Sequence, residues 1–251
     1  PVLVAAIVLR IPYYLQEQNC TMGQANKYFY RWAKKVFIAF ENTLDSVPEK
    51  YKSKFIATGN PLREEFYNKN KNEERKNLEI REDEKVILVI GGSLGAKSIN
   101  EAVVKNWEKI ILDEKIKLFW GTGKDNFEED TYRMKNFGNS VVKPYFNNVA
   151  DIMSASDLVI CRAGASTISE LIQLEKHSIL IPYDFVGQKE NADVLEYVNG
   201  AKIFTNETAD KAVEEALTLV KQDEMLEFMK ENIIKLKKGN ASDTIIEEMG
   251  L

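Results

Sequence analysis

The chain has 251 residues, the length of one large domain or two domains of modest size. Its 34 Lys and Arg residues against 39 Asp and Glu residues give a formal net charge of −5, which disfavours binding to nucleic acid. The 44% hydrophobic and 29% charged residues are typical of a globular protein and exclude disorder and fibres. Two cysteines cannot build a disulfide framework and are typical of a protein of the reducing cytosol.

We expect no targeting signal in the first residues of this sequence. The apolar run over residues 2–9 is shorter than the ~18–20 residues of a membrane span, and no basic region precedes it as in a signal peptide. The chain opens with Pro1 rather than Met, directly at a structured segment. We therefore expect a fragment whose first domain lacks its beginning.

The first 60 residues alternate short apolar runs with helical patterns. We expect a helix over 1–9, an amphipathic segment over 23–36, and strands over 11–15, 36–39 and 54–57. Residues 24–37 place aromatic side chains on nearly all sides of a basic helix. Two interpretations stand: a core helix with a basic outer face, the commoner case, and a helix attached to an anionic membrane surface.

The stretch over residues 64–84 is rich in charge and has almost no apolar residues except Leu78 and Ile80. Such a composition predicts a linker or a solvated helix between two domains. We therefore predict a first domain over 1–62, a second over 63–238, and a last helix over 239–251 that returns to the first domain.

After residue 85 the alternation of strands and helices becomes regular. This rhythm predicts an α/β fold with a parallel sheet covered on both faces. The expected strands are 86–90, 117–120, 140–143, 158–161, 178–181 and 202–204, and the expected helices 96–112, 126–136, 149–155, 166–174, 190–197, 240–251 and two within 209–237.

A glycine-rich turn joins the expected strand 86–90 to its helix. Gly91, Gly92 and Gly95 allow backbone N–H groups to approach an anion, and the start of the helix adds about half a positive charge. The spacing G-G-x-x-G fits neither the dinucleotide fingerprint nor the phosphate loop of ATPases. A tight turn without any ligand remains the alternative for this motif alone.

A second small-residue turn follows the expected strand 158–161. It leads from Arg162 into a helix that carries hydroxyl groups at its start and Glu170 in its first turns. The carboxylate of Glu170 is placed to accept hydrogen bonds from a diol, whereas the alternative is an ordinary helix cap at Ser166. Two such turns at the carboxyl ends of strands in one sheet favour a crevice for a nucleotide diphosphate.

Three further features carry less specific signals. The turn 58–63 contains Pro61 and presents Arg63, which can bind phosphate through two hydrogen bonds or stand alone on the surface. Four polar residues over 16–19 follow the strand 11–15 and lie in an exposed loop or face a polar ligand. His177, the only histidine, is expected to be a solvated loop residue, and no arrangement of carboxylates calls for a metal ion.

Taken in order, these strings resemble the MurG-type glycosyltransferases, and the resemblance covers nearly the whole chain. It rests on several ordered strings: Glu17-Gln18-Asn19, Gly23-x-x-Asn26-Lys27, Thr58-Gly59-Asn60-Pro61-x-Arg63, Gly91-Gly92-Ser93-x-Gly95-Ala96, Cys161-Arg162-Ala163-Gly164-Ala165-x-Thr167-x-Ser169-Glu170 and Gln188-x-x-Asn191-Ala192.

The resemblance implies a GT-B fold, with two Rossmann-like domains of which the first is incomplete here. It implies transfer of N-acetylglucosamine from UDP-N-acetylglucosamine to the C4 hydroxyl of N-acetylmuramic acid in lipid I, the undecaprenyl-diphosphate-linked pentapeptide, with inversion. The product is lipid II for peptidoglycan. No metal or other cofactor is implied. The enzyme would lie on the inner leaflet at the cytoplasmic face of the bacterial cell membrane as a peripheral protein.

The same resemblance implies which residues bind the donor. Arg63 and Ser93 would contact the diphosphate, Tyr145 and Phe146 the uracil, and Glu170 the ribose. Gln188 would read the sugar hydroxyls, and Asn19 would reach the donor from the opposite wall. The complete set is Asn19, Arg63, Ser93, Phe146, Ala165, Ser166, Thr167, Ile168, Ser169, Glu170 and Gln188.

Some positions depart from the family pattern. The histidine that commonly precedes Glu-Gln-Asn is Gln16, the glutamine after Gly-Gly-Ser is Leu94, and Gly187 stands where a polar residue is common. Glu17 is the only ionisable residue of its loop, but nothing assigns it as the general base. Three alternatives remain open: a non-catalytic UDP-sugar-binding half, a UDP-N-acetylglucosamine 2-epimerase, and a lipid galactosyltransferase.

Overall fold

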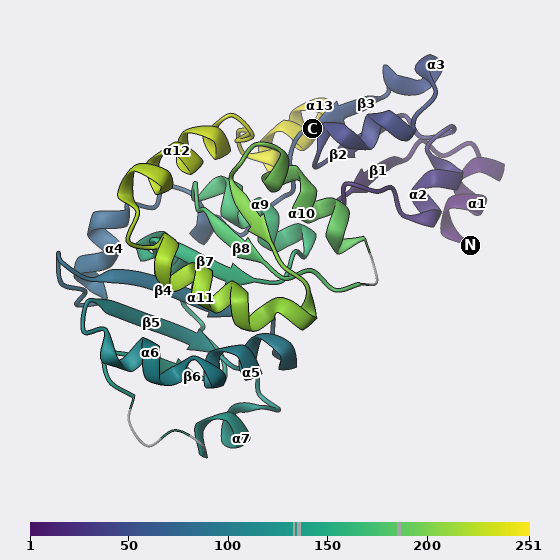
Figure 1. Ribbon diagram of the computed structural model, residues 1–251. Helices are drawn as coiled ribbons and strands as arrows, with labels where there is room; N and C mark the ends of the chain where they lie inside the picture. The colour runs from purple at the N-terminus through teal and green to yellow at the C-terminus, as the bar shows by residue number, and fades with distance from the viewer. Residues whose placement is uncertain (133, 135–136, 185–186) are drawn as a thin grey trace. The chain divides into compact units, whose positions relative to one another are not determined.

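The computed structural model describes all residues except 133, 135–136 and 185–186 (Figure 1). The chain divides into two compact units. The first combines Pro1–Leu62 with Lys237–Leu251, and the second is Arg63–Leu236. Both contain a parallel β-sheet with helices, so the α/β class expected from the alternating pattern is confirmed.

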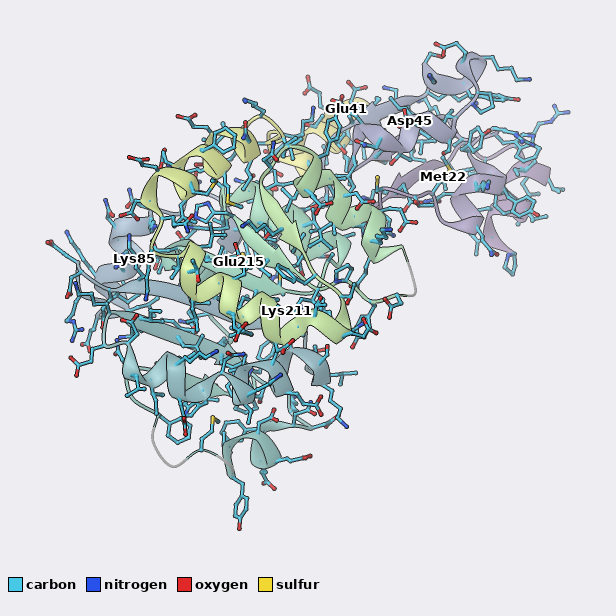
Figure 2. All side chains as sticks on the ribbon, viewed as in Figure 1. Met22, Glu41, Asp45, Lys85, Lys211 and Glu215 are labelled. Carbon is cyan, nitrogen blue, oxygen red and sulfur yellow. The ribbon has the colours of Figure 1, made fainter. Side chains whose placement is uncertain are left out.

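The first unit is built on a three-stranded sheet in the order β1-β2-β3, in which both pairings are parallel. Its core contains Leu15, Tyr30, Val36 and Phe55, together with Met22, which Figure 2 labels. Its elements are α1 (Val2–Val8), β1 (Tyr14–Glu17), α2 (Gln24–Phe29), β2 (Lys35–Ile38), η1 (Glu41–Ser46), α3 (Glu49–Lys52), β3 (Phe55–Ala57) and α13 (Ala241–Met249).

The end of the chain joins this first unit through α13. Lys35 Nζ on β2 donates to the side chain and the backbone carbonyl of Glu248, both at 2.7 Å. The Tyr14 hydroxyl on β1 donates to the carbonyl of Met249 at 3.4 Å. These bonds attach residues more than 200 positions apart in the sequence to the same small sheet.

The prediction of a helix over 23–36 was wrong for its second half. α2 ends at Phe29, and Lys35 already belongs to strand β2. The four residues of β2 pair with β1 on one side and β3 on the other, and three of them are buried. Burial between two strands therefore outweighs the helical spacing of the preceding aromatic residues.

The second unit is built on a six-stranded parallel sheet in the order β6-β5-β4-β7-β8-β9, with helices on both faces (Figure 1). The central pair β4 and β7 marks the point where successive strands change direction of travel across the sheet. The strands are β4 (Lys85–Ile90), β5 (Ile116–Gly121), β6 (Val141–Lys143), β7 (Leu158–Cys161), β8 (Ser178–Leu180) and β9 (Ala201–Ile203).

Alternate residues of these strands face two helical layers. Ile87, Trp120 and Ile160 pack with apolar residues of α5, α6, α11 and α12, while their sequence neighbours point to the other face. The helices are η2 (Glu64–Phe66), α4 (Lys71–Asn77), α5 (Lys97–Lys105), α6 (Trp107–Leu112), α7 (Phe127–Tyr132), α8 (Val149–Ala155), α9 (Ala165–Gln173), α10 (Gln188–Tyr197), η3 (Asn206–Thr208), α11 (Ala209–Leu219) and α12 (Asp223–Ile234).

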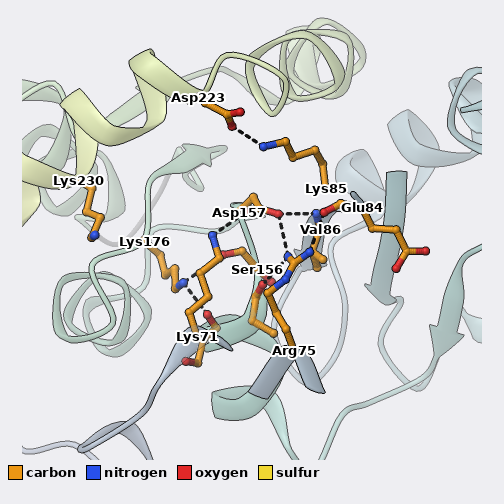
Figure 3. A network of polar contacts seen from close by, with 12 residues as sticks. Lys71, Arg75, Glu84, Lys85, Val86, Ser156, Asp157, Lys176, Asp223 and Lys230 are labelled. Atoms are coloured by element: carbon orange, nitrogen blue, oxygen red, sulfur yellow. Dashed lines mark hydrogen bonds and ion pairs between the residues drawn. The ribbon is translucent and has the colours of Figure 1, made fainter. Parts of the chain in front are cut away.

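The segment 64–84 is not a linker, contrary to its composition. It forms η2 and α4, packs against α8, and buries the Phe66 side chain completely. Asp157 accepts bonds from Lys71 Nζ at 2.5 Å, Arg75 at 3.2 Å and the Val86 backbone N–H at 2.7 Å (Figure 3). Ion pairs to a buried carboxylate thus replace the apolar contacts that the sequence lacks.

His177 is not a solvated residue as expected, but is 6% exposed. Burial, and then the charges of Lys176 and Lys71, lower the pKa of its imidazole to about 3. Lys176 beside it is equally buried and donates to the carbonyls of Ser154 and Ser156 at 2.6 and 3.0 Å, close to the end of α8. The short loop before β8 is therefore buried rather than solvated.

Two expected helices differ in extent. The helix expected over 96–112 breaks at Asn106 into α5 and α6. The one expected over 126–136 forms α7 over Phe127–Tyr132, and part of its remainder lies outside the described residues. Among the helices that the structure describes, none has the length and apolar character to cross a bilayer.

Candidate functional site

The turn after β4 is compact because glycines stand where side chains would collide. A Cβ on Gly91 would lie 2.4 Å from the backbone nitrogen of Ala96, and one on Gly95 would lie 2.1 Å from the carbonyl oxygen of Thr122. Gly95 also has a φ of +83°, which side-chain-bearing residues rarely adopt. The turn therefore packs directly against the backbone that follows β5.

Two side-chain amides connect the turn after β4 to the backbone that follows β5. Asn100 on α5 donates to the Thr122 carbonyl at 2.8 Å and accepts from the indole N–H of Trp120 at 3.2 Å. Asn126 donates to the carbonyl of Leu94 at 3.0 Å. The backbone around Ser93 is thus supported from α5 and from the strand next to β4.

A cavity of about 200 Å³ opens beside this turn. Charged residues, backbone and aromatic rings contribute to its lining. The lining residues are Arg63, Ile90, Gly92, Ser93, Gly121, Pro144, Tyr145, Phe146, Val149 and Glu170. The structure therefore brings together four of the residues predicted to bind the donor, Arg63, Ser93, Phe146 and Glu170, with Tyr145.

The aromatic part of the cavity is rigid on one side. Phe146 is 4% exposed and meets Phe119 edge to face with ring centroids 6.1 Å apart. The ring also lies close to the end of β5, since a Cβ on Gly121 would be 3.5 Å from it, an ordinary van der Waals distance. Tyr145, in contrast, is 45% exposed. A planar ligand can therefore lie against Tyr145 while Phe146 shapes the floor.

The charged part of the cavity consists of Arg63 and Glu170. Burial raises the pKa of the Glu170 carboxyl to about 7, although the charge of Arg63 opposes this and that of Glu65 reinforces it. Arg63 pairs with Glu65 at 2.8 Å and lies over the ring of Phe66, its carbon Cζ 5.2 Å from the centroid. The guanidinium is thus held at the rim by a carboxylate that an anionic ligand can replace.

The first turns of α9 present backbone more than side chains. Gly164, not Ser166, is the N-cap residue, so the alternative of an ordinary helix cap at Ser166 does not apply. Ala165, Ile168 and Ser169 are buried, and the Ser169 hydroxyl donates to the Ala165 carbonyl at 3.0 Å. The backbone N–H of Ile168 donates to the Gly164 carbonyl at 2.9 Å and is not available to a ligand, whereas Ser166 and Thr167 at the start of the helix reach solvent.

Gln188 lies at the start of α10, where its side-chain oxygen accepts the backbone N–H of Tyr183 at 3.1 Å. The ring of Tyr183 stacks on the guanidinium of Arg162, 4.0 Å from its centroid. Arg162 in turn donates to the Ile181 carbonyl at 2.7 Å. Residues 185–186 of this loop lie outside the described residues.

Asn19 belongs to the first unit, in the turn after β1. It does not line the cavity of the second unit, and its contact with a donor stays a prediction. Its backbone and side chain both donate to the carboxylate of Glu17, at 3.1 and 3.4 Å. Gln16, in place of the family's histidine, donates to Asn60 at 2.8 Å.

Sequence reasoning missed the turn after β5. Gly121 lines the cavity, and Gly123 has a φ of +87° with its Cβ position 2.3 Å from the nitrogen of Gly95. The available signal was the pair of glycines directly after a buried strand, in register with the glycine turn of the neighbouring strand. Among the described residues, no three His, Cys, Asp or Glu side chains are grouped to hold a metal ion.

The comparisons with known proteins agree on one family. A model of the glycosyltransferase family 28 C-terminal domain matches residues 86–247. The UDP-N-acetylglucosamine–N-acetylmuramyl-(pentapeptide) pyrophosphoryl-undecaprenol N-acetylglucosamine transferase of Fusobacterium nucleatum is 46% identical over 100% of this chain, which spans 71% of that protein. The transferase of the same name from Acetivibrio thermocellus is 35% identical over 98% of the chain and 68% of its own length.

The solved structures that match include a member of this family. The crystal structure of Acinetobacter baumannii MurG matches with a TM-score of 0.76 at 26% identity, over 99% of this chain and 70% of that one. A UDP-N-acetylglucosamine 2-epimerase from Neisseria meningitidis matches with a TM-score of 0.65, over 98% of this chain and 71% of that one. Its identity is 19%, so this likeness concerns the fold alone.

Two α/β units, each with a parallel sheet, and a cavity beside the glycine turn at the carboxyl edge of the second sheet define a GT-B glycosyltransferase. The predicted fold class is confirmed. The chain belongs to the family of UDP-N-acetylglucosamine–N-acetylmuramyl-(pentapeptide) pyrophosphoryl-undecaprenol N-acetylglucosamine transferases. The resemblance stated from the ordered motifs is confirmed as well.

Proposed function

We propose that this protein transfers N-acetylglucosamine from UDP-N-acetylglucosamine to lipid I, giving lipid II in peptidoglycan synthesis. The observation that carries the proposal is the cavity that joins Arg63, Ser93 and Glu170 beside the Phe146 ring. The Fusobacterium relative, whose name states this reaction, matches the whole chain, and the MurG structure matches 99% of it with a TM-score of 0.76. The epimerase shares the fold at much lower identity, which favours the transferase over the epimerase alternative.

The chemistry that we propose is a direct displacement with inversion. The C4 hydroxyl of the acceptor attacks the anomeric carbon of N-acetylglucosamine, the bond to the diphosphate breaks, and UDP leaves. The negative charge that grows on the diphosphate would be met by the Arg63 guanidinium and by the N–H groups at the start of α9. Glu170 would accept hydrogen bonds from the ribose diol, which requires its ionised form.

Replacing Arg63 by alanine is expected to weaken binding of UDP-N-acetylglucosamine by about 10–100-fold, because a charge-assisted pair with phosphate is lost. The affinity of Arg63→Lys should lie between that of wild type and that of Arg63→Ala, since lysine keeps the charge but not the forked geometry. Isothermal calorimetry on the purified chain measures each dissociation constant. UDP release in the presence of lipid I should fall in the same order.

Arg81 is a matched control, because it is 59% exposed and lies in the loop before β4, at the opposite edge of the sheet from the cavity. Arg81→Ala should leave the dissociation constant unchanged. The proposal is wrong if wild-type protein releases UDP equally with lipid I and with diacylglycerol, or if it converts the donor to its 2-epimer. Equal affinities of wild type and Arg63→Ala would remove Arg63 from the site.

We further propose that the enzyme works at the cytoplasmic face of the cell membrane, attached through a surface around α2. Tyr28 and Trp32 are 72% and 56% exposed. Lys27, Arg31 and Lys34 are exposed within the same stretch of eight residues. Exposed aromatic rings among lysines and arginines are typical of surfaces that bind anionic lipid, and the acceptor proposed here is itself anchored in the membrane.

Replacing both Tyr28 and Trp32 by serine is expected to lower partitioning onto vesicles of phosphatidylglycerol and phosphatidylcholine at least about tenfold, since two rings no longer enter the interface. Cosedimentation measures the bound fraction. Tyr197→Ser is the matched control, because Tyr197 is 88% exposed on α10 of the second unit. Equal binding of wild type and double variant would contradict the proposed attachment surface.

A further inference from the structure

Glu17 carries a buried carboxylate inside the turn that follows β1. Its Oε1 accepts from the backbone N–H of Asn19 at 3.1 Å and from the Asn19 side chain at 3.4 Å. Its Oε2 accepts from the backbone N–H of Gly23 at 2.7 Å and from the Asn26 side chain at 2.9 Å. The residue is only 3% exposed, so the turn closes around the carboxylate.

The four hydrogen bonds to its side chain explain why residue 17 is acidic. An ionised carboxylate offers two oxygens with about four acceptor positions, whereas a glutamine offers one oxygen. Four donors therefore occupy the Glu17 carboxylate. Removing a proton from a substrate hydroxyl would require Glu17 to give up bonds that hold the turn, and the geometry does not favour it as a general base.

Residues from the other two strands of the sheet hold the opposite side of the turn. The hydroxyl of Thr43, which follows β2, donates to the carbonyls of Asn19 and Cys20 at 3.4 and 3.1 Å. The side chain of Asn60, which follows β3, donates to the carbonyl of Gln18 at 3.0 Å. Thr43 and Asn60 are themselves buried. Polar side chains after all three parallel strands thus converge on one short segment.

That segment lies at the carboxyl edge of a parallel sheet, where α/β proteins place their ligands. A turn with no ligand could be closed by apolar packing, whereas here a buried charge and two buried polar side chains define the conformation of residues 18–23. Gln18 is exposed and Asn19 is partly exposed. The buried bonds therefore fix the direction of residues that reach solvent.

We propose that Glu17 is a positioning residue, which sets the conformation of residues 18–23 so that Asn19 meets the sugar during transfer. The inference rests on the proposed function, because UDP-N-acetylglucosamine is the donor that Asn19 is predicted to contact. Asn26 belongs to the same device, since its amide bridges Glu17 Oε2 and the carbonyl of Gln16, both at 2.9 Å. Neither Glu17 nor Asn26 needs to touch the substrate.

Steady-state kinetics of UDP release with lipid I test the proposal in the full enzyme. Glu17→Gln should lower kcat about 10–100-fold and leave the dissociation constant of UDP-N-acetylglucosamine within about twofold. Asn26→Ala should lower kcat about tenfold, and the double variant should be no slower than Glu17→Gln, because both changes disrupt one network. Glu41→Gln, on an exposed residue of the same unit, should keep the wild-type kcat.

The pH profile separates positioning from proton transfer. If Glu17 positions the turn, Glu17→Gln keeps the shape of the wild-type profile of kcat at a lower level. Loss of the acidic limb in Glu17→Gln, with full activity in Asn26→Ala, would make Glu17 the base and overturn the inference. Wild-type kcat in both variants would overturn it as well.

Failure of the proposed function looks different, because wild-type enzyme would then release no UDP with lipid I. Where Glu17→Gln fails to fold by circular dichroism, Asn26→Ala alone decides between the outcomes. Lowered kcat with intact donor affinity supports positioning, and unchanged kcat contradicts it.

Discussion

Replacing Glu170 by glutamine is expected to stabilise the protein above pH 7 and to weaken its binding of UDP-N-acetylglucosamine. Burial raises the pKa of this carboxyl from 4.5 to about 7 in the folded state. The folded protein therefore prefers the protonated form, and its stability falls as the pH rises from about 4.5 through 7. Glutamine carries no proton to lose and avoids this decline.

The size of the effect follows from the same shift. A difference of this size corresponds to roughly 3 kcal/mol at most, which partial solvent access reduces to about 1–3 kcal/mol. Urea unfolding at pH 5 and at pH 8 measures it. The two proteins should agree closely at pH 5, and Glu170→Gln should be the more stable at pH 8. Glu101 on α5 is 60% exposed and serves as the control. Glu101→Gln should have the wild-type free energy of unfolding at both pH values.

Donor binding should change in the opposite direction. The ribose diol donates two hydrogen bonds to an ionised carboxylate, and glutamine can accept only at its single oxygen. We expect calorimetry to show a dissociation constant about 10–100-fold larger for Glu170→Gln than for wild type. The affinity of wild type should increase between about pH 6 and 8. Parallel stability curves, or an affinity independent of pH in this range, would contradict the role of Glu170.

Such a result would identify Glu170 as a residue kept at the expense of stability, which is common at binding sites. The carboxyl of Glu170 lines the cavity beside Phe146, where a negative charge is unfavourable until a ligand supplies hydrogen-bond donors. Sequence reasoning could place Glu170 after the small-residue turn of β7. It could not find the raised pKa, which depends on burial and on the positions of Arg63 and Glu65.

The strands of the second unit were predictable because a buried parallel strand is a continuous apolar run between glycine-rich turns. Residues 86–90 and 158–161 show this pattern, and both lie in the centre of the sheet. The cavity residues Ser93 and Glu170 could be found for the same reason. Ser93 lies in the turn after β4 and Glu170 on the helix that follows β7, so the topology brings both to one edge.

The segment 64–84 shows where this reasoning fails. Its fold depends on pairs between distant residues: Lys69 with Asp151 at 2.5 Å, and Arg75 with Asp157 at 3.2 Å. Local composition shows the charges but not their partners, which lie more than 80 positions away. The burial of His177 was missed for a related reason, since the loop before β8 is covered by residues from elsewhere in the chain.

Replacing Gly95 by alanine is expected to abolish donor binding or to destabilise the second unit by at least about 3 kcal/mol. The new Cβ would lie 2.1 Å from the Thr122 carbonyl oxygen and 2.8 Å from the Asn126 amide nitrogen. Thr122 cannot move away easily, because its N–H donates to the carbonyl of Lys143 at 3.1 Å and its carbonyl accepts from Asn100. The turn that carries Ser93 must shift instead.

Gly92 is the matched control, three residues earlier in the same turn. Its φ of +91° is as unfavourable for alanine as that of Gly95, but a Cβ there meets no atom within 4 Å. Gly92→Ala should therefore cost about 1–2 kcal/mol from backbone strain alone. Urea unfolding compares the two, because Gly92 itself lines the cavity and its variant is a control for stability only. Equal losses would mean that backbone strain dominates and that close packing against the β5 turn does not shape the site.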